Sequence, residues 1–400
     1  MTNKLKILDD TAPAIGVINW PITDEADISM VNDVLLSKNW GFESKYELLF
    51  NELFNEYNQT AYGFLVANGT VSLEIALKAC NIGLNDEVII PALTWVATAY
   101  AVKAVGANPV FVDIDINTLT IDPISVSKAI TKNTRAIIPV HLYGNMANMD
   151  ALCDIAKKNR LYIIEDCAHA HGSEWRNKKA GSIGDIGSFS FQSAKLITSG
   201  EGGFLSTNQL ELARKLYGLK NCGRKMDDQS EYLLGGNHRI SELQSALLVG
   251  QLKKHKMYAQ MRYKNRKYLD QLLNRIGGIN SMPLQNEVTN NSQYRYAFKY
   301  NCDAFNGLSI SAFTDVLEAE GVLVHSMYTP IYRHELYPLK NSNVDLKTGL
   351  LNTEKVMKDI ILLNHAMLLE QQTVEIIYEI IKTVKNNSKE LQRIYENGNR

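Results

Sequence analysis

The sequence is poor in cysteine, in net charge and in long apolar runs. Its 400 residues include 5 cysteines, and 42 basic side chains nearly balance 43 acidic ones, which leaves a net charge of −1. An odd number of scattered cysteines is typical of reduced thiols in a cytoplasmic protein and excludes a small disulfide-stapled scaffold. The balanced charge provides no general attraction for nucleic acid or for an anionic membrane. Because no apolar run reaches about 18 residues and the first residues lack an apolar signal core, we expect no membrane span and no secretory signal.

What the sequence does contain is an alternation of short apolar runs and longer amphipathic segments. The apolar runs are residues 62–67, 87–91, 109–113, 136–142, 161–165, 186–191 and 203–207. Strands that alternate with helices predict a mostly parallel sheet, here of seven strands, with helices covering both of its faces.

The region beyond about residue 241 has a different pattern, which begins with a long helical segment. We expect a strand at residues 296–300, helices at residues 311–320 and 373–384, and a polar, frayed end from about residue 386. The sequence therefore predicts a two-domain α/β protein. The large domain, with an N-terminal arm, is expected at residues 1–255 and the smaller α+β domain at residues 256–400.

Two of the loops that follow predicted strands carry residues suited to holding a ligand. In open α/β sheets, ligands bind beyond the carboxyl ends of the strands. Gly69 and Thr70 stand between a strand and a helix, where free amides and the helix dipole form a seat for phosphate. An ordinary turn with a threonine cap fits the same residues. Trp95 follows the next strand, where it could stack on a flat ring or fill the core.

Two acids, Glu165 and Asp166, end a third apolar run. One of them could pair with a cationic heterocycle at the edge of the sheet. Cys167, His169 and His171 would share one side of an extended chain, which is the pattern of a zinc cluster. We expect no metal site, because no second ligand group such as CxxC stands at zinc spacing. A packed, hydrogen-bonded role is the alternative for each histidine, and it is the one that we expect for His171.

Lys195 lies between two strand-like runs and is followed by glycine-rich chain at residues 200–203. A lysine in a desolvated pocket has a lowered pKa and can act as a nucleophile or Schiff base. A solvated lysine in a surface loop is the ordinary alternative. Asn237 and Arg239 stand just before the long helix, where they could cap it or reach an anion.

In their order and spacing, these motifs resemble the pyridoxal-phosphate-dependent sugar aminotransferases of the DegT/DnrJ/StrS type, within the aspartate-aminotransferase (fold type I) superfamily. The most specific segment is SerPheSerPheGlnSerAlaLys at residues 188–195, with GlyGluGlyGly at residues 200–203. Three further motifs stand along the chain in the family's order, namely AsnGlyThr, GluAspCysAlaHis and GlyGlyAsnHisArgIleSerGlu. The resemblance covers nearly the whole chain. It implies a fold type I enzyme with pyridoxal 5'-phosphate (PLP) as cofactor and pyridoxamine 5'-phosphate (PMP) as its intermediate form.

The resemblance also implies roles for single residues. Lys195 matches the Schiff-base lysine; some relatives that carry histidine there are dehydratases, so the lysine implies transamination. Asp166 matches the carboxylate that keeps the pyridine nitrogen protonated, which makes the ring an electron sink. Trp95 matches the ring-stacking residue, and His169 lies where the family places a residue near the phenolic oxygen. The residues that match the phosphate-binding positions are Gly69, Thr70 and Ser190.

Asn237 resembles a residue that reaches the phosphate from the neighbouring subunit, with Arg239 as a further cofactor-binding candidate. The resemblance therefore implies a homodimer with shared active sites. Two segments, residues 140–150 and 328–333, resemble the cyclitol enzymes that aminate inososes with L-glutamine. A motif common in nucleotide-sugar enzymes is altered here, with Met327 and Tyr332 in place of two histidines. The substrate-binding candidates are Tyr328, Tyr332 and Arg333.

The expected reaction transfers an amino group from L-glutamine or L-glutamate to the ketone of a sugar or cyclitol, with or without a linked nucleotide. An alternative is an enzyme like 3-amino-5-hydroxybenzoate synthase, which uses the same cofactor. A third hypothesis, a non-catalytic regulator that binds the cofactor, would require a DNA-binding segment or a basic face. The balanced charge argues against it.

Overall fold

The computed structural model describes residues 5–6, 15–16, 19–228, 230–335, 344 and 349–397, and its central feature is a seven-stranded sheet. The strands follow the order β1-β9-β8-β5-β4-β2-β3 across the sheet. Their bounds are β1 (Tyr62–Val66), β2 (Glu87–Pro91), β3 (Asn108–Val112), β4 (Thr134–Ile137), β5 (Tyr162–Asp166), β8 (Ile186–Ser190) and β9 (Gly203–Thr207). Each of the seven predicted runs overlaps one of these strands.

The sheet is mostly parallel, as predicted. Parallel pairing joins β3 to β2, β2 to β4, β4 to β5 and β5 to β8. The exception is β9, which pairs antiparallel with both β8 and β1. The predicted run at residues 136–142 leaves the sheet earlier than expected, because β4 ends at Ile137 and a 3-10 turn, η1 (Leu142–Gly144), follows.

Side chains along the strands alternate between two apolar cores, one on each face of the sheet. Val66 and Ile164 pack on one face, while Leu65 and Ile163 pack on the other. The first core is closed by α3 (Gly69–Ala79), α4 (Val96–Ala104) and α7 (Leu210–Lys220). The second core is closed by α2 (Lys45–Asn58), α5 (Pro123–Ala129), α6 (Met149–Asn159) and the start of α8 (Glu242–Leu273). Helices therefore cover both faces, which confirms the expected arrangement.

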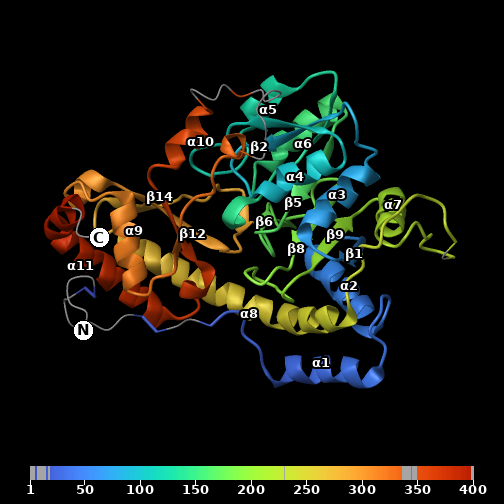
Figure 1. The fold of residues 1–400 in the computed structure, drawn as a ribbon, viewed down its shortest axis with the longest axis horizontal. Helices are drawn as coiled ribbons and strands as arrows, with labels where there is room; N and C mark the ends of the chain where they lie inside the picture. Colours follow the sequence, from blue (N-terminus) through green and yellow to red (C-terminus); the bar gives the residue numbers. More distant parts are fainter. Residues whose placement is uncertain are drawn as a thin grey trace.

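A smaller antiparallel sheet, in the order β10-β12-β14-β13, forms the core of the C-terminal region. Its strands are β10 (Ile279–Ser281), β12 (Arg295–Tyr300), β13 (Val324–His325) and β14 (Ile360–Asn364). It packs with α9 (Ile310–Ala319) and α11 (Gln371–Glu396) around a third apolar core. Figure 1 shows these elements beside the large sheet, with α8 running beneath both.

Helix α8 joins the two sheets without a break. Val249 near its start belongs to a core of the large sheet, whereas Leu269 and Leu272 near its end belong to the C-terminal core. The predicted division between residues 1–255 and 256–400 falls inside this helix. Leu5, at the other end of the chain, also packs into the C-terminal core.

The final helix is longer than the sequence analysis predicts. We expected the chain to fray from about residue 386, but α11 continues to Glu396. The apolar stripe carried by Ile381 and Val384 continues through Ser388 and Leu391, and all four side chains are buried. The prediction was wrong because burial at these two later positions stabilises two further turns that are otherwise polar.

The remaining elements lie around these layers. They are α1 (Glu25–Ser37), α10 (Leu351–Val356) and a three-stranded sheet made of β6 (Glu174–Trp175), β7 (Lys178–Lys179) and β11 (Val288–Asn290). Among the described residues, we find no helix with the length and apolar character needed to cross a membrane.

Candidate active site

A cavity of about 740 Å³ opens where several strands of the large sheet end. Its walls come from the loops after β1, β2, β4, β5 and β8, and from Tyr294 and Tyr328 of the C-terminal region. The residues predicted for the site that line it are Gly69, Thr70, Trp95, Asp166, His169, Ser190, Lys195 and Tyr328. Motifs far apart in the sequence therefore meet in one cavity, at the edge of the sheet where ligands bind in such folds.

The N-terminus of α3 forms one end of the cavity. Asn68, not Thr70, is the N-cap: its side chain accepts a hydrogen bond from the amide of Val71 at 2.9 Å. The amide of Ser72 donates to the Asn68 carbonyl, so the amides of Gly69 and Thr70 remain available at the positive end of the helix dipole. This arrangement can hold a phosphate group.

Gly69 allows α3 and β8 to approach each other at this point. A Cβ atom on Gly69 would lie 2.6 Å from the Cβ atom of Ser190, which is closer than real side chains pack. The absent side chain therefore lets the Ser190 hydroxyl and the helix amides face the same part of the cavity.

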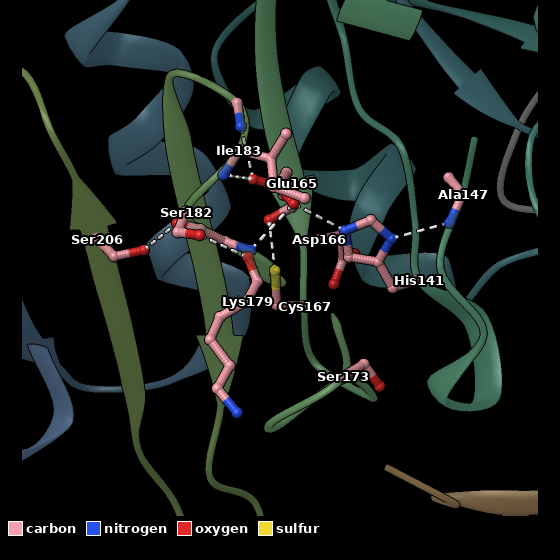
Figure 2. A network of polar contacts seen from close by, with 12 residues as sticks. His141, Ala147, Glu165, Asp166, Cys167, Ser173, Lys179, Ser182, Ile183 and Ser206 are labelled. Carbon is pink, nitrogen blue, oxygen red and sulfur yellow. Dashed lines mark hydrogen bonds and ion pairs between the residues drawn. The ribbon is translucent and has the colours of Figure 1, made fainter. Parts of the chain in front are cut away.

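Glu165 and Asp166, the two acids at the end of β5, have different environments (Figure 2). One carboxylate oxygen of Glu165 accepts hydrogen bonds from the amides of Ile183, at 2.8 Å, and Gly184, at 2.7 Å. The other oxygen accepts from the Gly181 amide at 3.0 Å and from the His141 ring at 2.9 Å. Glu165 thus ties together the ends of two strands and the loop before β8, while Asp166 lines the cavity.

The two ring nitrogens of His141 have different partners in this network. Its Nδ1 atom accepts a hydrogen bond from the amide of Ala147 at 3.2 Å, so the ring proton lies on Nε2 and is donated to Glu165 (Figure 2). His141, Glu165 and Cys167 place possible ligand atoms within 4.8 Å of one another. Because the His141 and Glu165 atoms already have hydrogen-bond partners, this group forms a hydrogen-bond network.

The extended chain that would place Cys167, His169 and His171 on one side is not present. β5 ends at Asp166, and the chain turns there, since the Ala170 amide donates to the Cys167 carbonyl. The three side chains therefore separate. His169 faces the cavity, and the His171 ring packs 5.5 Å from the ring of Phe191. The packed role expected for His171 fits this position.

Asp166 is buried and held in place by two donors. Its carboxylate accepts hydrogen bonds from the Thr98 hydroxyl at 3.0 Å and from the Ala168 amide at 3.2 Å. Burial raises the pKa of Asp166, while these hydrogen bonds and the charge of Lys195 oppose the rise. A cationic partner in the cavity would keep this carboxylate ionised.

Lys195 lies in the loop between β8 and β9, and its side chain reaches the cavity. Its backbone is held by the indole of Trp20, which donates to the Lys195 carbonyl at 3.2 Å. Burial lowers the pKa of Lys195 to about 7, which the charge of Asp166 opposes and that of Arg295 reinforces. About half of the amine with this pKa is neutral at pH 7, and the neutral form is a nucleophile. The alternative of a solvated surface lysine does not fit this position.

Aromatic rings form a wall of the cavity on the side of the C-terminal region. Trp95 is 56% exposed, which rules out the core role, and its ring centroid lies 5.4 Å from that of Tyr328. Tyr328 lies 5.7 Å from Tyr143, and Tyr143 stacks parallel to His169 at 5.9 Å. His169 in turn stacks on Tyr294 at 4.1 Å. A flat ligand between this wall and Asp166 would be surrounded by ring faces and edges.

His169 is neutral in this environment. Burial lowers its pKa well below the usual value, and the charges of Lys195 and Arg295 lower it further. The amide of Tyr143 donates to Nδ1 of His169 at 3.4 Å, so the proton lies on Nε2. His169 can therefore donate one hydrogen bond to a ligand.

Asn237 and Arg239 do not line the cavity of their own chain. The Arg239 guanidinium donates to the Asn221 side chain at 3.1 Å and lies 4.5 Å from the centroid of the Phe42 ring. Neither residue caps α8, since Ser241 does so through a capping box with Gln244. The capping alternative is therefore wrong for both.

Tyr332 and Arg333 are not among the residues that line the cavity. Tyr332 is fully buried, and its hydroxyl donates to Glu354 at 2.6 Å. The Arg333 guanidinium donates to the same carboxylate oxygen, also at 2.6 Å. The structure thus brings Tyr328 to the cavity and pairs the other two candidates with Glu354.

Several residues at the site escaped the sequence analysis. Thr98 was missed because the sequence offers one indication of its role, its position about one helical turn after Trp95. Tyr143 was missed because its left-handed backbone, with a φ of 58°, depends on tertiary contacts that the sequence does not show. Tyr294 and Arg295 precede a predicted strand at residue 296, where an aromatic residue beside a cation offers a weak signal.

Comparison with known proteins agrees with this geometry. Residues 21–382 match the model of the DegT/DnrJ/EryC1/StrS aminotransferase family. The chain belongs to this family and is an aminotransferase. It is similar to L-glutamine:2-deoxy-scyllo-inosose aminotransferase from Streptoalloteichus tenebrarius, with 39% identity over 336 residues, which cover 80% of this chain and 79% of the relative.

Solved structures share the fold over almost the whole chain. A 3-amino-5-hydroxybenzoic acid synthase matches with a TM-score of 0.84 and 29% identity, covering 93% of this chain and 99% of that one. A sugar aminotransferase of Streptococcus pneumoniae, solved in its PMP form, matches with a TM-score of 0.83 and 25% identity. That match covers 94% of this chain and 100% of the other. The predicted fold type I architecture is confirmed.

Proposed function

We propose that the protein is a PLP-dependent aminotransferase that moves the amino group of L-glutamine to the ring ketone of a cyclitol. The observation that carries the proposal is the meeting of Lys195, Asp166 and the N-terminus of α3 in one cavity. These groups are an amine with a pKa near 7, a buried carboxylate and a helix end that can bind an anion. They match the aldehyde, the pyridine nitrogen and the phosphate of PLP.

The residues of the cavity fit this cofactor. The amides of Gly69 and Thr70 and the Ser190 hydroxyl would hold the phosphate, and the close approach at Gly69 keeps space for it. Asp166 would accept a hydrogen bond from the protonated pyridine nitrogen, and the hydrogen bond from Thr98 holds the carboxylate in this orientation. When bound, the cofactor withdraws electrons from the carbon that loses a proton.

Trp95 and His169 complete the proposed cofactor site. The exposed ring of Trp95 is available to stack on a pyridine ring. The Nε2 proton of His169 is available to a ligand oxygen, since the Tyr143 amide occupies the other nitrogen. Asp166 and His169 would then serve the ring nitrogen and the phenolic oxygen of the cofactor.

Lys195 does the acid–base work in this proposal. A neutral Lys195 amine would hold the cofactor, and once freed by the donor it would take a proton from the α-carbon of that donor. The resulting ammonium group then returns the proton on the other side of the transfer. A pKa of about 7 suits both steps, because the two protonation states are then close in free energy at physiological pH.

We also propose a homodimer that shares its active sites, with Asn237 reaching the phosphate of the partner's cofactor. Supporting this, Asn237 and Arg239 lie outside the cavity of their own chain, on a segment whose Leu234 is 97% exposed. The five cysteines form no disulfide, which supports a reducing compartment such as the cytoplasm.

The choice of donor and acceptor rests on the relatives. The Streptoalloteichus tenebrarius relative is named for L-glutamine and 2-deoxy-scyllo-inosose, and its similarity extends over most of both chains. Tyr328 lies at the cavity wall next to Trp95, where it can contact the hydroxyls of a ring substrate. Tyr332 and Arg333 would act through Glu354 and position this wall.

The test is a reaction of the purified protein with PLP, L-glutamine and 2-deoxy-scyllo-inosose, analysed for the aminocyclitol by mass spectrometry. We expect the amine product in amounts equal to the keto acid formed from the donor. A parallel reaction contains a nucleotide-linked keto sugar in place of the cyclitol. Amination of the nucleotide-linked sugar alone would replace the proposed acceptor but keep the reaction class.

A second candidate function is a synthase like the 3-amino-5-hydroxybenzoic acid enzyme, which one observation favours. That enzyme shares the fold at 29% identity over 93% of this chain. The same assay distinguishes the two, since an aminotransferase alone converts the donor to its keto acid. A product formed without keto acid would favour the synthase.

A further inference from the structure

The loop that carries Lys195 is held by two ring N–H groups that lie outside the cavity. The indole of Trp20 donates to the Lys195 carbonyl at 3.2 Å, and Nε2 of His365 donates to the Ala194 carbonyl, also at 3.2 Å. Trp20 belongs to the N-terminal arm, whereas His365 begins the 3-10 helix η5 (His365–Leu368) of the C-terminal region. Two segments far apart in the sequence therefore fasten neighbouring carbonyls of this loop.

Packing alone does not fix the loop, because a second pocket borders it. This pocket, of about 250 Å³, is lined in part by Trp20, His365, Ser193 and Ala194. The described residues that line it are all different from those that line the larger cavity. The loop thus borders open space at Lys195 and again at Ser193 and Ala194, and side chains resist movement only where atoms are in contact. The two ring N–H groups supply a restraint at these carbonyls that packing does not.

Arg262 of α8 lies against the Trp20 ring and is a fully buried cation. Its guanidinium carbon lies 5.0 Å from the centroid of the Trp20 ring and 5.9 Å from that of Tyr258. In the part of the chain that the structure describes, none of the three side-chain nitrogens of Arg262 has a hydrogen-bond partner. Burial lowers the pKa of Arg262 to about 9, so the group still carries its charge near neutral pH.

An unpaired charge in this position destabilises the fold and needs an explanation. A buried ion without an acceptor is strongly unfavourable, and an apolar side chain of similar size would fill the same space without that penalty. What the cation provides is an electric field at the face of the Trp20 ring. It draws electron density from the indole, which makes the N–H group a stronger donor toward the Lys195 carbonyl.

We propose that Trp20 is a positioning residue for Lys195, and that Arg262 strengthens the hydrogen bond by which Trp20 holds the loop. This inference rests on the proposed function. Lys195 must stay in place after the donor frees its amine, because it then carries a proton from one carbon to another. An anchored backbone keeps the amine within reach of both carbons, and a misplacement of about 1 Å can lower a rate about 100-fold.

The experiment is a double-mutant cycle with Trp20→Phe, Arg262→Met and the combined variant. Trp20→Phe keeps an aromatic ring but removes the indole N–H, and Arg262→Met removes the charge but keeps a long side chain. PLP-loaded protein is mixed with L-glutamine, and absorbance gives the rate constant of this half-reaction at saturation and the half-saturating concentration. Urea denaturation gives the free energy of unfolding of each protein.

The matched control is Trp40→Phe. The Trp40 indole also donates to a backbone carbonyl, that of Val34, at 3.1 Å, and Trp40 is not among the residues that line the cavity. The same substitution therefore removes the same kind of hydrogen bond at a different place. We expect the rate constant of Trp40→Phe to equal that of the wild type.

We expect Trp20→Phe to lower the saturated rate constant by about 10–100-fold. Arg262→Met should lower it by about 2–30-fold, which is the range of a cation–π contact. The half-saturating concentration should change by less than about threefold, because neither residue lines the cavity. In the Trp20→Phe background, Arg262→Met should have no further effect on the rate, since the indole N–H is already absent.

The free energy of unfolding separates positioning from a structural role. Arg262→Met should be at least as stable as the wild type, because it removes a buried unpaired charge. A purely structural arginine would give the opposite result, with lower stability and an unchanged rate constant per folded molecule.

Equal rate constants for Trp20→Phe and the wild type would overturn the proposal, as would an undiminished effect of Arg262→Met in the Trp20→Phe background. If Trp20→Phe does not fold, Arg262→Lys decides, because it keeps a charge at the ring and should keep most of the rate that Arg262→Met loses. Equal losses in these two variants would also overturn the proposal. If the wild type itself converts no amino acid, the proposed function fails, and this result is read before any variant is compared.

Discussion

Glu165 and Asp166 are neighbours on β5, and their carboxylates face opposite sides of the sheet. Glu165 lies on the side of Ile163, where His141 and three backbone amides surround it, and Asp166 lies on the side of Ile164, in the cavity. Because side chains alternate along the strand, one of these two similar residues stabilises the fold and the other faces the cavity.

The first prediction concerns Asp166. Asp166→Asn keeps the size and the hydrogen bond from the Ala168 amide but removes the negative charge that would pair with a protonated pyridine nitrogen. We expect turnover to fall by about 10²–10³-fold or more, as for the loss of a preorganised electrostatic contact. The free energy of unfolding should stay within about 1 kcal/mol of wild type, because the Thr98 hydroxyl can accept from the new NH₂ group and donate to Thr94. Steady-state kinetics and urea denaturation check the two parts.

Glu165→Gln is predicted to lose stability and to keep most of its turnover, the opposite of Asp166→Asn. The new amide group would place N–H donors against the backbone amides that now donate to the carboxylate. We expect a loss of about 3 kcal/mol in the free energy of unfolding, since buried donors lose their acceptor. Turnover per folded molecule should fall far less than in Asp166→Asn. A stable Glu165→Gln variant would show that the network in Figure 2 contributes little.

Gly69→Ala tests the phosphate seat. Its methyl group would meet the Cβ atom of Ser190 at 2.6 Å, so the end of α3 must move away from β8. We expect the dissociation constant of PLP to rise by at least about tenfold, because the helix amides lose their alignment. Gly83→Ala is the matched control, since the atom nearest to its added Cβ would be the Val105 carbonyl oxygen at 3.6 Å. Fluorescence titration with PLP measures both, and equal affinities would exclude the seat at Gly69.

The stability of the cofactor-free protein should depend on pH through Lys195. Burial lowers the pKa of Lys195 to about 7 in the folded state, against an ordinary value of 10.5. Between these values, the unfolded chain binds one proton more than the folded chain, so the free energy of unfolding increases with pH. Below pH 7 both states are protonated and the full penalty remains.

Lys195→Met removes this titration and is the comparison that isolates it. Relative to Lys195→Met, the wild type should gain up to about 1.4 kcal/mol of stability for each pH unit between pH 7 and pH 10. Urea denaturation at fixed protein concentration gives both curves. Parallel curves over this range would mean that the Lys195 amine has an ordinary pKa.

Mixed dimers test the shared active site. Lys195→Ala and Asn237→Asp should each be nearly inactive alone, the second because its carboxylate repels the phosphate. If Asn237 serves the partner's site, a heterodimer of the two variants has one intact site. Random exchange should then restore about a quarter of the wild-type activity. No recovery after exchange would place Asn237 in the site of its own chain.

Local patterns in the sequence were enough to predict the strands and most of the cavity. The apolar runs matched the seven strands because each strand is buried on both faces, which leaves a continuous apolar signal. Gly69, Asp166 and Lys195 were found because they stand directly after such runs, where the chain enters the cavity.

Residues that depend on tertiary contacts were beyond prediction. Tyr294 reaches the cavity from just before β12 in the C-terminal region, and no local pattern reports that contact. The end of α11 was misjudged because Leu391 is buried by the C-terminal core and not by its own helix. Tyr332 was expected at the substrate, but its hydroxyl donates to Glu354 and the residue does not line the cavity.

The absorbance spectrum of the purified protein with added PLP tests the central claim most directly. We predict a yellow absorption from PLP bound to Lys195, which L-glutamine converts to the spectrum of PMP. The Lys195→Ala variant should show neither change. If the wild type develops no such absorption, or if Lys195→Ala develops it equally, Lys195 is not the residue that binds the cofactor and the account is contradicted.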